Sequence, residues 1–150
     1  MSGKYFDELS IGEESMSERR TVTEADLVMF CSLCGLQNPL FVDEEFARKT
    51  AFGTRVIPGP LTVSYAIGLG GYLYSGTSTA VLSWDNIKFT RPVKPGDTIS
   101  LKTTVTGKRE SSSQRDRGIV NLRHEVLNQH NEVVCTFDRS LMVLKERGAA

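Results

Sequence analysis

The stretch Ile57-Pro-Gly-Pro-Leu-Thr62, with the apolar run 61–73 (LTVSYAIGLGGYL) that overlaps its end, decides the fold of this chain. Pro60 suits the first position of a helix, where its missing N–H is no loss. The predicted helix is apolar on nearly every side, which is typical of a helix wrapped by other structure. The run is also too short to span a bilayer. We therefore expect one buried central helix.

Three glycines lie within this helix, Gly68, Gly70 and Gly71, and each costs about 1 kcal/mol relative to Ala. We expect them to allow close approach to a neighbouring backbone. The alternative, a dinucleotide-binding fingerprint at GLGG, requires a preceding strand and glycines at the start of the helix. Neither condition is met, so we reject it.

Two further helices are predicted upstream. Thr23 can cap the first, acidic residues follow it, and apolar residues at three-to-four spacing continue to a terminating Gly35. Asp43 can cap a second, short helix over 43–49. Between them, Asn38-Pro39 is a strong turn signal.

From residue 79 onward the pattern predicts antiparallel strands over 80–90, 98–108, 119–127 and 132–145. Val120, Leu122, His124 and Val126 share one face of the third strand. The turn 128–131 contains Asn131, a residue type that tolerates positive φ. Helices followed by strands predict an α+β fold, in a single domain over residues 1–150.

Composition narrows the function classes. Eighteen basic residues balance eighteen acidic ones, so no global field favours nucleic acid or anionic lipid. The first fifteen residues show no export or transit signal, which makes the cytoplasm the default location. Cys31 and Cys34 form a C-x-x-C, but no second pair or nearby His completes a metal site. At helical spacing the two thiols are expected to share a face as small hydrophobes.

The predicted segments, in their order and spacing, resemble the MaoC-like hydratase/dehydratase family over nearly the whole chain. The matching pieces are Tyr5-Phe6, Gly12, Thr21–Asp26, Asn38–Leu40, Asp43–Ala47, Phe52-Gly53, Val56–Leu61, Phe89, Pro92-Val93, Gly96-Asp97, Asn128-Gln129 and Val133-Val134. The resemblance implies the hot-dog fold, in which a curved antiparallel sheet wraps a long helix. It also implies a dimer of two joined sheets, which would protect exposed sheet edges.

The resemblance further implies an activity: adding water to, or removing it from, acyl thioesters of coenzyme A or acyl carrier protein, without another cofactor. In the family, a loop reading Gly-Asp-x-Asn-Pro-Leu-His-x-Asp supplies an Asp and a His that hold one water and transfer both protons. The start of the central helix receives the thioester oxygen, a role that maps to Gly59 and Pro60. The plainer interpretation is that these two residues merely start a helix.

This chain departs from the family at both proton-transferring positions. The loop reads Gly35-Leu-Gln-Asn-Pro-Leu-Phe-Val-Asp43, so Leu36 replaces the Asp and Phe41 replaces the His. Pro58 replaces a further His that is common before the helix. Neither hydrocarbon at 36 and 41 can accept or donate a proton, so the dyad is absent.

Other groups are weak catalytic candidates. Asp43 is near in sequence, but capping a helix explains it better. His124 is expected to face the sheet interior as a satisfied core residue, and Cys34 has no identifiable base beside it. His130 lies in a turn and is expected to be exposed.

Binding can persist without the dyad. Asn38 is a candidate for orienting a ligand, although in an Asn-Pro turn it more often bonds its own backbone. The cations of one hairpin could meet coenzyme A phosphates, although a solvated hairpin explains them equally: Lys108, Arg109, Arg115 and Arg117. Three hypotheses stay open: a hydratase or dehydratase, a non-catalytic thioester-binding or partner subunit in a homodimer or heteromer, and a thioesterase.

Overall fold

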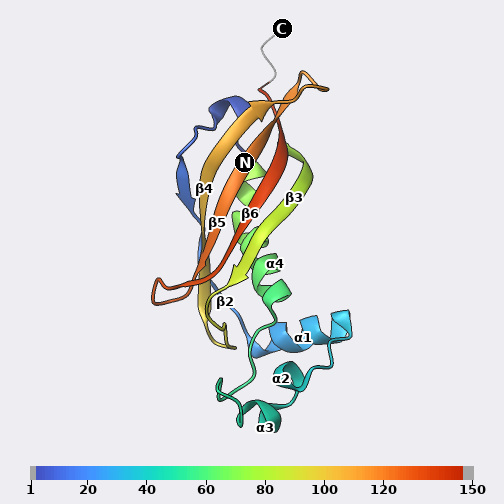
Figure 1. Ribbon diagram of the computed structural model, residues 1–150, viewed down its shortest axis with the longest axis vertical. Coiled ribbons are helices and arrows are strands. Elements are labelled where there is room, and N and C mark those ends of the chain that lie inside the picture. The colour runs from blue at the N-terminus through green and yellow to red at the C-terminus, as the bar shows by residue number, and fades with distance from the viewer. Residues whose placement is uncertain (1–2, 147–150) are drawn as a thin grey trace.

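The computed structural model describes residues 3–146. Figure 1 shows a curved antiparallel sheet running along a central helix, α4 (Gly59–Gly70), with the shorter helices gathered below the start of α4. The long strands are β3 (Ser78–Phe89), β4 (Thr98–Glu110), β5 (Arg117–Leu127) and β6 (Val133–Leu144). These bounds agree with the predicted strands to within a few residues. The prediction of an α+β fold is therefore confirmed.

The sheet has the strand order β1-β4-β5-β6-β3, and every pairing is antiparallel. Two short strands, β1 (Glu14–Met16) and β2 (Arg20–Thr21), both pair with β4 and were not predicted. They are too short to show an alternating pattern. On the opposite side, β3 is an edge strand, and within residues 3–146 it pairs with β6 alone.

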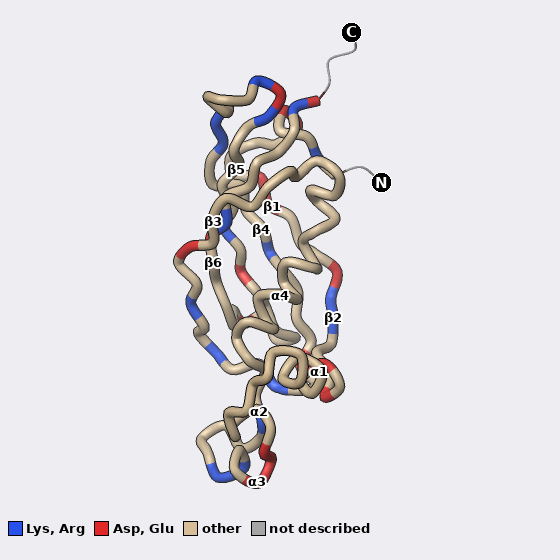
Figure 2. The backbone as a smooth tube through the Cα atoms, turned by 90° about the vertical axis from the view of Figure 1, so that its right-hand side faces the viewer, with Lys and Arg blue, Asp and Glu red and all other residues tan. Residues whose placement is uncertain are grey.

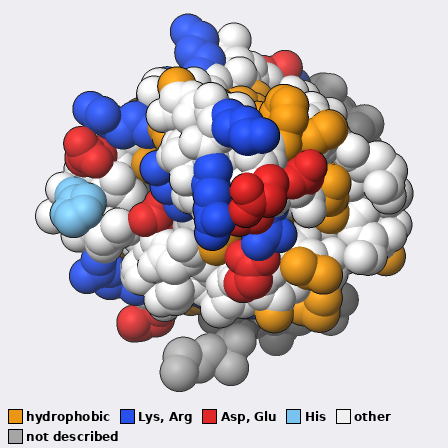
Figure 3. Space-filling view, turned by 90° about the horizontal axis from the view of Figure 1, so that it is seen from below, with side chains coloured by type: hydrophobic (Ala, Val, Ile, Leu, Met, Phe, Trp, Pro, Cys, Tyr) orange, Lys and Arg blue, Asp and Glu red, His pale blue; other side chains and the backbone are white. Residues whose placement is uncertain are grey.

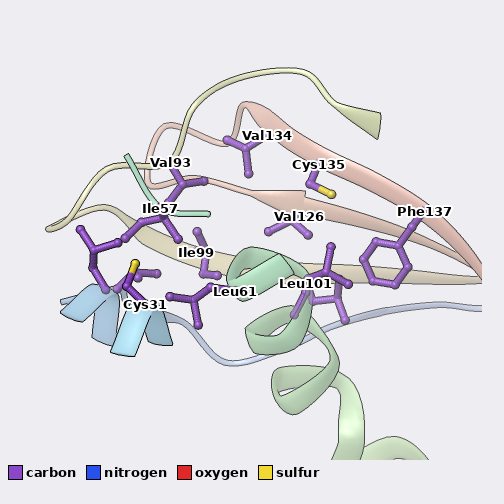
Figure 4. Packing of buried hydrophobic residues seen from close by; sticks show 14 residues of the cluster. Cys31, Ile57, Leu61, Val93, Ile99, Leu101, Val126, Val134, Cys135 and Phe137 are labelled. Atoms are coloured by element: carbon purple, nitrogen blue, oxygen red, sulfur yellow. The ribbon is translucent and has the colours of Figure 1, made fainter. Parts of the chain in front are cut away.

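The core lies between α4 and the inner face of the sheet. Figure 2 shows α4 lying along one face of the strands, and Figure 4 shows side chains of the sheet, such as Leu101, Val126 and Phe137, directed toward it. Leu61 and Ala66 of α4 are buried in this cluster. Burying a large apolar side chain contributes about 1.5–3 kcal/mol, so this interface holds the helix in place.

The prediction that α4 is covered on nearly every side is wrong for one stripe of the helix. Pro60, Ser64 and Gly68, spaced by four residues, are exposed. This stripe adjoins β3, where the sheet ends and no further strand of the described chain continues around the helix. The open side of α4 and the free edge of the sheet therefore coincide.

The three helical glycines have different surroundings. A Cβ on Gly70 would meet Leu101 Cδ2 at 2.7 Å, so α4 approaches β4 closely there. A Cβ on Gly68 would meet nothing within 4 Å, and the same holds for Gly71, which begins the short 3₁₀ helix η2 (Gly71–Tyr74). Close approach is thus correct for Gly70 alone, and its partner is a side chain rather than a backbone.

The upstream helices begin and end at the predicted signals. Thr23 caps α1 (Glu24–Cys34) by accepting a hydrogen bond from the Asp26 N–H at 3.2 Å, and Gly35 ends it with φ of 64°. Asp43 caps α3 (Glu44–Ala47) by accepting from the Phe46 N–H at 3.0 Å. Sequence reasoning missed α2 (Pro39–Val42), because Asn-Pro was interpreted as a turn. A 3₁₀ turn, η1 (Phe6–Glu8), was also missed.

Three smaller predictions can be compared with the structure. Asn131 has the expected positive φ, at 61°. The two thiols of the C-x-x-C do not share an environment, because Cys31 is buried and Cys34 is exposed.

Within residues 3–146, no helix is long and apolar enough to cross a membrane. Figure 3 shows basic and acidic side chains interleaved at the end of the molecule that carries α3.

Candidate functional site

An open apolar groove lies at the start of α4, and we call it the N-terminal groove. Its volume is about 440 Å³. It is lined by Leu40, Phe41, Phe52, Val56, Ile57, Gly59, Pro60, Thr62, Phe89, Thr90, Arg91, Pro92, Val93 and Val134. Gly59 is the first residue of α4, so its N–H has no acceptor within the helix. The groove therefore combines a hydrocarbon wall with a backbone donor at the positive end of a helix.

A second groove adjoins the first along the free edge of the sheet, and we call it the β3 groove. It has a volume of about 420 Å³ and is lined by Pro60, Val63, Ser64, Trp84, Ile87 and Phe89. Phe89 and Pro60 border both grooves. The Phe89 ring lies against Gly59, since a Cβ there would be 2.5 Å from Phe89 Cζ. A ligand with a polar head and a hydrocarbon tail could thus occupy the two grooves together.

The two dyad positions lie beside the N-terminal groove but carry no proton-transferring group. Leu36 and Phe41 are partly buried and pack against the core cluster. Both border a smaller pocket of about 160 Å³, and Phe41 also borders the N-terminal groove. The loop thus brings the two positions together next to the start of α4. At both positions the loop presents a hydrocarbon side chain to the smaller pocket.

Arg55 is the charged residue that borders the smaller pocket beside Leu36 and Phe41. Its guanidinium is held by Glu44, with Nε 3.1 Å from Oε2, and by Glu24. Hydrogen bonds from Arg55 keep the pKa of Glu44 below its usual value. This ion pair network ties α1 and α3 to the segment before α4, so it positions the loop.

The other catalytic candidates are placed apart from the grooves or have structural partners. Asp43 is exposed and caps α3, and Cys34 is exposed at the end of α1. Neither lines either groove. His130 is exposed in the β5–β6 turn. Asn38 accepts a hydrogen bond from the Leu40 N–H at 3.0 Å, which starts α2 and occupies its side-chain oxygen.

His124 is buried on the inner face of β5. Its Nδ1 lies 3.0 Å from Thr103 Oγ1, and its ring lies 4.7 Å from the Phe137 ring, centroid to centroid. Burial lowers the pKa of His124 to about 3, and the positive charge of Arg139 acts in the same direction. A neutral imidazole that lines neither groove is poorly placed to exchange protons with a ligand there.

The predicted phosphate-binding cations are at the other end of the molecule. The β4–β5 hairpin lies at the top of Figure 1, far from the start of α4. Lys108 donates to the carbonyls of Phe6 and Leu9 at 2.8 and 2.7 Å, so its position has a structural explanation.

Sequence reasoning missed Arg91, the cation that lines the N-terminal groove and pairs with Glu132 at 3.5 Å. Its position next to Pro92-Val93 was the available signal.

The arrangement of one long helix and a curved antiparallel sheet is the hot-dog fold. Residues 8–127 match the MaoC like domain family, and the chain belongs to that family. A solved structure of the monoamine oxidase regulatory protein from Archaeoglobus fulgidus superimposes with a TM-score of 0.88 and 34% identity, over 98% of each chain.

The chain is also similar to two named bacterial proteins. The chain is 38% identical to protein MaoC of Klebsiella aerogenes over 103 residues, which is 67% of this chain and 30% of that protein. It is 33% identical to an (R)-specific enoyl-CoA hydratase of Rhodospirillum rubrum over 69% of this chain and 70% of that enzyme. The chain thus spans under a third of the first relative, and most of the second.

Proposed function

We propose that this chain binds acyl thioesters in the N-terminal groove and the β3 groove, and does not hydrate them through an Asp/His pair. The observation that carries the proposal is the loop beside Gly59. It keeps the turn and the helix caps at Asn38 and Asp43, yet places Leu36 and Phe41 against the core. Binding surface is therefore retained where proton-transferring groups are missing.

The size of the missing contribution supports a non-catalytic role. One positioned acid or base typically contributes about 10²–10⁴-fold to a rate. The lining of the two grooves contains no Asp, Glu or His that could replace the pair. The same absence disfavours a thioesterase, which needs a carboxylate or an activated water near the carbonyl carbon.

The molecule is proposed to act as a dimer joined through β3. Val81, Leu82, Trp84, Ile87 and Phe89 are all exposed, so both faces of this edge strand present apolar side chains. An open apolar edge is normally covered. A second sheet would continue the ladder and close the open side of the β3 groove, so that the acyl chain would lie between the two copies. The second copy is either this chain or a homologue that keeps the dyad, and in the latter heteromer the partner performs the hydration.

Calorimetric titration together with a hydration assay tests the proposal. The purified protein is titrated with crotonyl-coenzyme A, butyryl-coenzyme A and free coenzyme A, and loss of the crotonyl double bond is followed by absorbance. We expect both acyl thioesters to bind more tightly than free coenzyme A, with no hydration above the background rate. Equal affinity for free coenzyme A would refute the acyl site, and rapid hydration would refute the non-catalytic assignment.

A further inference from the structure

A buried arginine on the inner face of the sheet has no acidic partner. Arg139 is 6% exposed, and its Nε is buried with no hydrogen-bond partner. Nowhere in residues 3–146 does its guanidinium form an ion pair. Burial lowers its pKa, which reflects the penalty on the charge. Burying a cation without an anionic partner costs free energy, so the position of Arg139 requires an explanation.

The groups around Arg139 do not supply a negative charge. It alternates with Phe137 and Leu141 on the inner face of β6, where both of those residues are buried in the core. The titratable groups close to it are Tyr74 of η2, whose pKa burial raises to about 12, and His124, which is neutral. A second buried nitrogen without a partner, His124 Nε2, lies on the same face.

The acid groups nearest in the fold are occupied elsewhere. Asp138, the residue that precedes Arg139, points to the opposite face and pairs with Arg123 at 3.0 Å. Asn86 also donates to Asp138, at 2.8 Å. Glu13, whose negative charge helps to raise the pKa of Tyr74, pairs with Lys4. The described chain therefore leaves a positive site on the inner face of the sheet that an external anion could neutralise.

One residue of the β3 groove wall is adjacent to Arg139. Trp84 lines the groove and is the cross-strand partner of Arg139. The Trp84 ring stacks on Phe137 with centroids 6.3 Å apart, and Phe137 in turn contacts His124. The groove wall is thus in contact, through Trp84 and Phe137, with the residues that carry the two unpartnered nitrogens.

The strand register gives the distance from the start of α4. Phe89, which lies on Gly59, is paired with Cys135, whereas Trp84 is paired with Arg139. Four residues of β6 separate these two levels, or roughly 13 Å at the rise of an antiparallel strand. An acyl chain that begins at Gly59 and follows the β3 groove would end near Arg139 if it were of medium length.

We infer that Arg139, which lies across the strand pair from Trp84 of the β3 groove wall, receives a carboxylate carried at the far end of the acyl chain. The inference rests on the proposed function and specifies its ligand as an acyl thioester with a terminal carboxylate. A guanidinium binds a carboxylate through two parallel N–H···O bonds, and here the exchange would neutralise a charge that is otherwise buried alone. Trp84 and Phe137 would border the last carbons of the chain.

Paired ligands test this inference. Adipoyl-, suberoyl- and sebacoyl-coenzyme A are titrated into the full-length protein beside hexanoyl-, octanoyl- and decanoyl-coenzyme A. At one chain length, we expect the carboxylate to tighten binding by roughly tenfold to a hundredfold, the range of a hydrogen bond to a charged group. The short dicarboxylate is expected to show no such preference.

Two variants identify the residue responsible. Arg139→Met keeps the apolar stem and is expected to abolish the preference, so that the dicarboxylic and the uncharged chain of one length bind with equal affinity. It should also raise the unfolding temperature of the free protein, because it removes an unpaired buried charge. Arg123→Met is the matched control, since it removes one positive charge from the other face of the adjacent strand.

The outcomes separate this inference from the proposed function. If uncharged acyl thioesters bind and the carboxylate gives no advantage at any length, the inference fails and the proposed function stands. If no acyl thioester binds, both fail. If Arg139→Met lowers the unfolding temperature or dissociates a dimer, the arginine has a partner within the protein or on a second copy, and the inference is overturned.

Discussion

The Phe89 ring lies directly over the Cα of Gly59, close enough that a Cβ at position 59 would be 2.5 Å from Cζ and 2.8 Å from both Cε atoms. The first residue of α4 and the last residue of β3 are therefore in contact. The contact also places an aromatic ring between the two grooves, next to the first N–H of the helix. Access to that N–H depends on where Phe89 lies.

Gly59→Ala is expected to push Phe89 out of its position and weaken acyl-thioester binding by about tenfold, or about 1.4 kcal/mol. The ring is half exposed and can move, so the free energy of unfolding should change by less than about 1 kcal/mol. Gly68→Ala is the matched control on the same helix, where an added Cβ meets nothing. Calorimetry measures both variants. Adding Phe89→Ala to Gly59→Ala should restore binding, and a simple sum of the two losses would contradict the contact.

Restoring the missing pair tests whether the rest of the site is intact. Leu36→Asp together with Phe41→His is expected to gain hydration of crotonyl-coenzyme A, whereas neither single change should suffice, because both groups act on one water. The gain expected from a pair is at least about 10²-fold. Burying an unpaired carboxylate costs several kcal/mol, although Arg55 borders the same pocket. A double variant that folds and binds acyl thioesters without hydrating them would show that the loop geometry has diverged.

The edge of β3 is expected to join two copies. Light scattering at micromolar concentration should give the mass of a dimer, and Val81→Asp with Ile87→Asp should give a monomer by placing charges in an apolar interface. Leu33→Asp on α1 serves as the control, since Leu33 is 85% exposed and lies away from β3. A monomeric parent protein, or a control that dissociates equally, would be inconsistent with the interface.

His124 should make the protein less stable as the pH falls below neutrality. Its folded pKa, lowered by burial to about 3, is below its usual 6.5, so between these values the unfolded chain binds a proton that the folded protein does not. This stability is therefore fully present well above pH 6.5 and decreases by about 2 kcal/mol from pH 8 to pH 5. Urea unfolding at the two pH values measures the difference.

His124→Gln keeps a group that can bond Thr103 and should remove most of this pH dependence. His130→Gln, in the exposed β5–β6 turn, should retain it. Parallel behaviour of the two variants would mean that other groups cause the loss of stability at acidic pH.

The sequence alone determined the order of the long elements and much of the residue pattern that faces the core. The apolar run after Pro60 predicted α4, and the alternation of Val120, Leu122, His124 and Val126 predicted the buried face of β5. The caps at Thr23 and Asp43 marked the helix starts. These are local properties: a helix cap or an alternating strand depends on residues that are neighbours in the chain. The replacement of the dyad by Leu36 and Phe41 could likewise be read from the sequence once the family resemblance was established.

Only the tertiary structure decided which residues meet. The contact of Phe89 with Gly59, and the pairing of Trp84 with Arg139, join positions that are 30 and 55 residues apart. Strand register creates the second, the packing of α4 against the end of β3 creates the first, and no local pattern encodes either. The same holds for the open stripe of α4 beside the β3 edge. Burial depends on what the rest of the chain covers, so an apolar helix and an unpaired arginine acquire their roles only when the sheet curves around them.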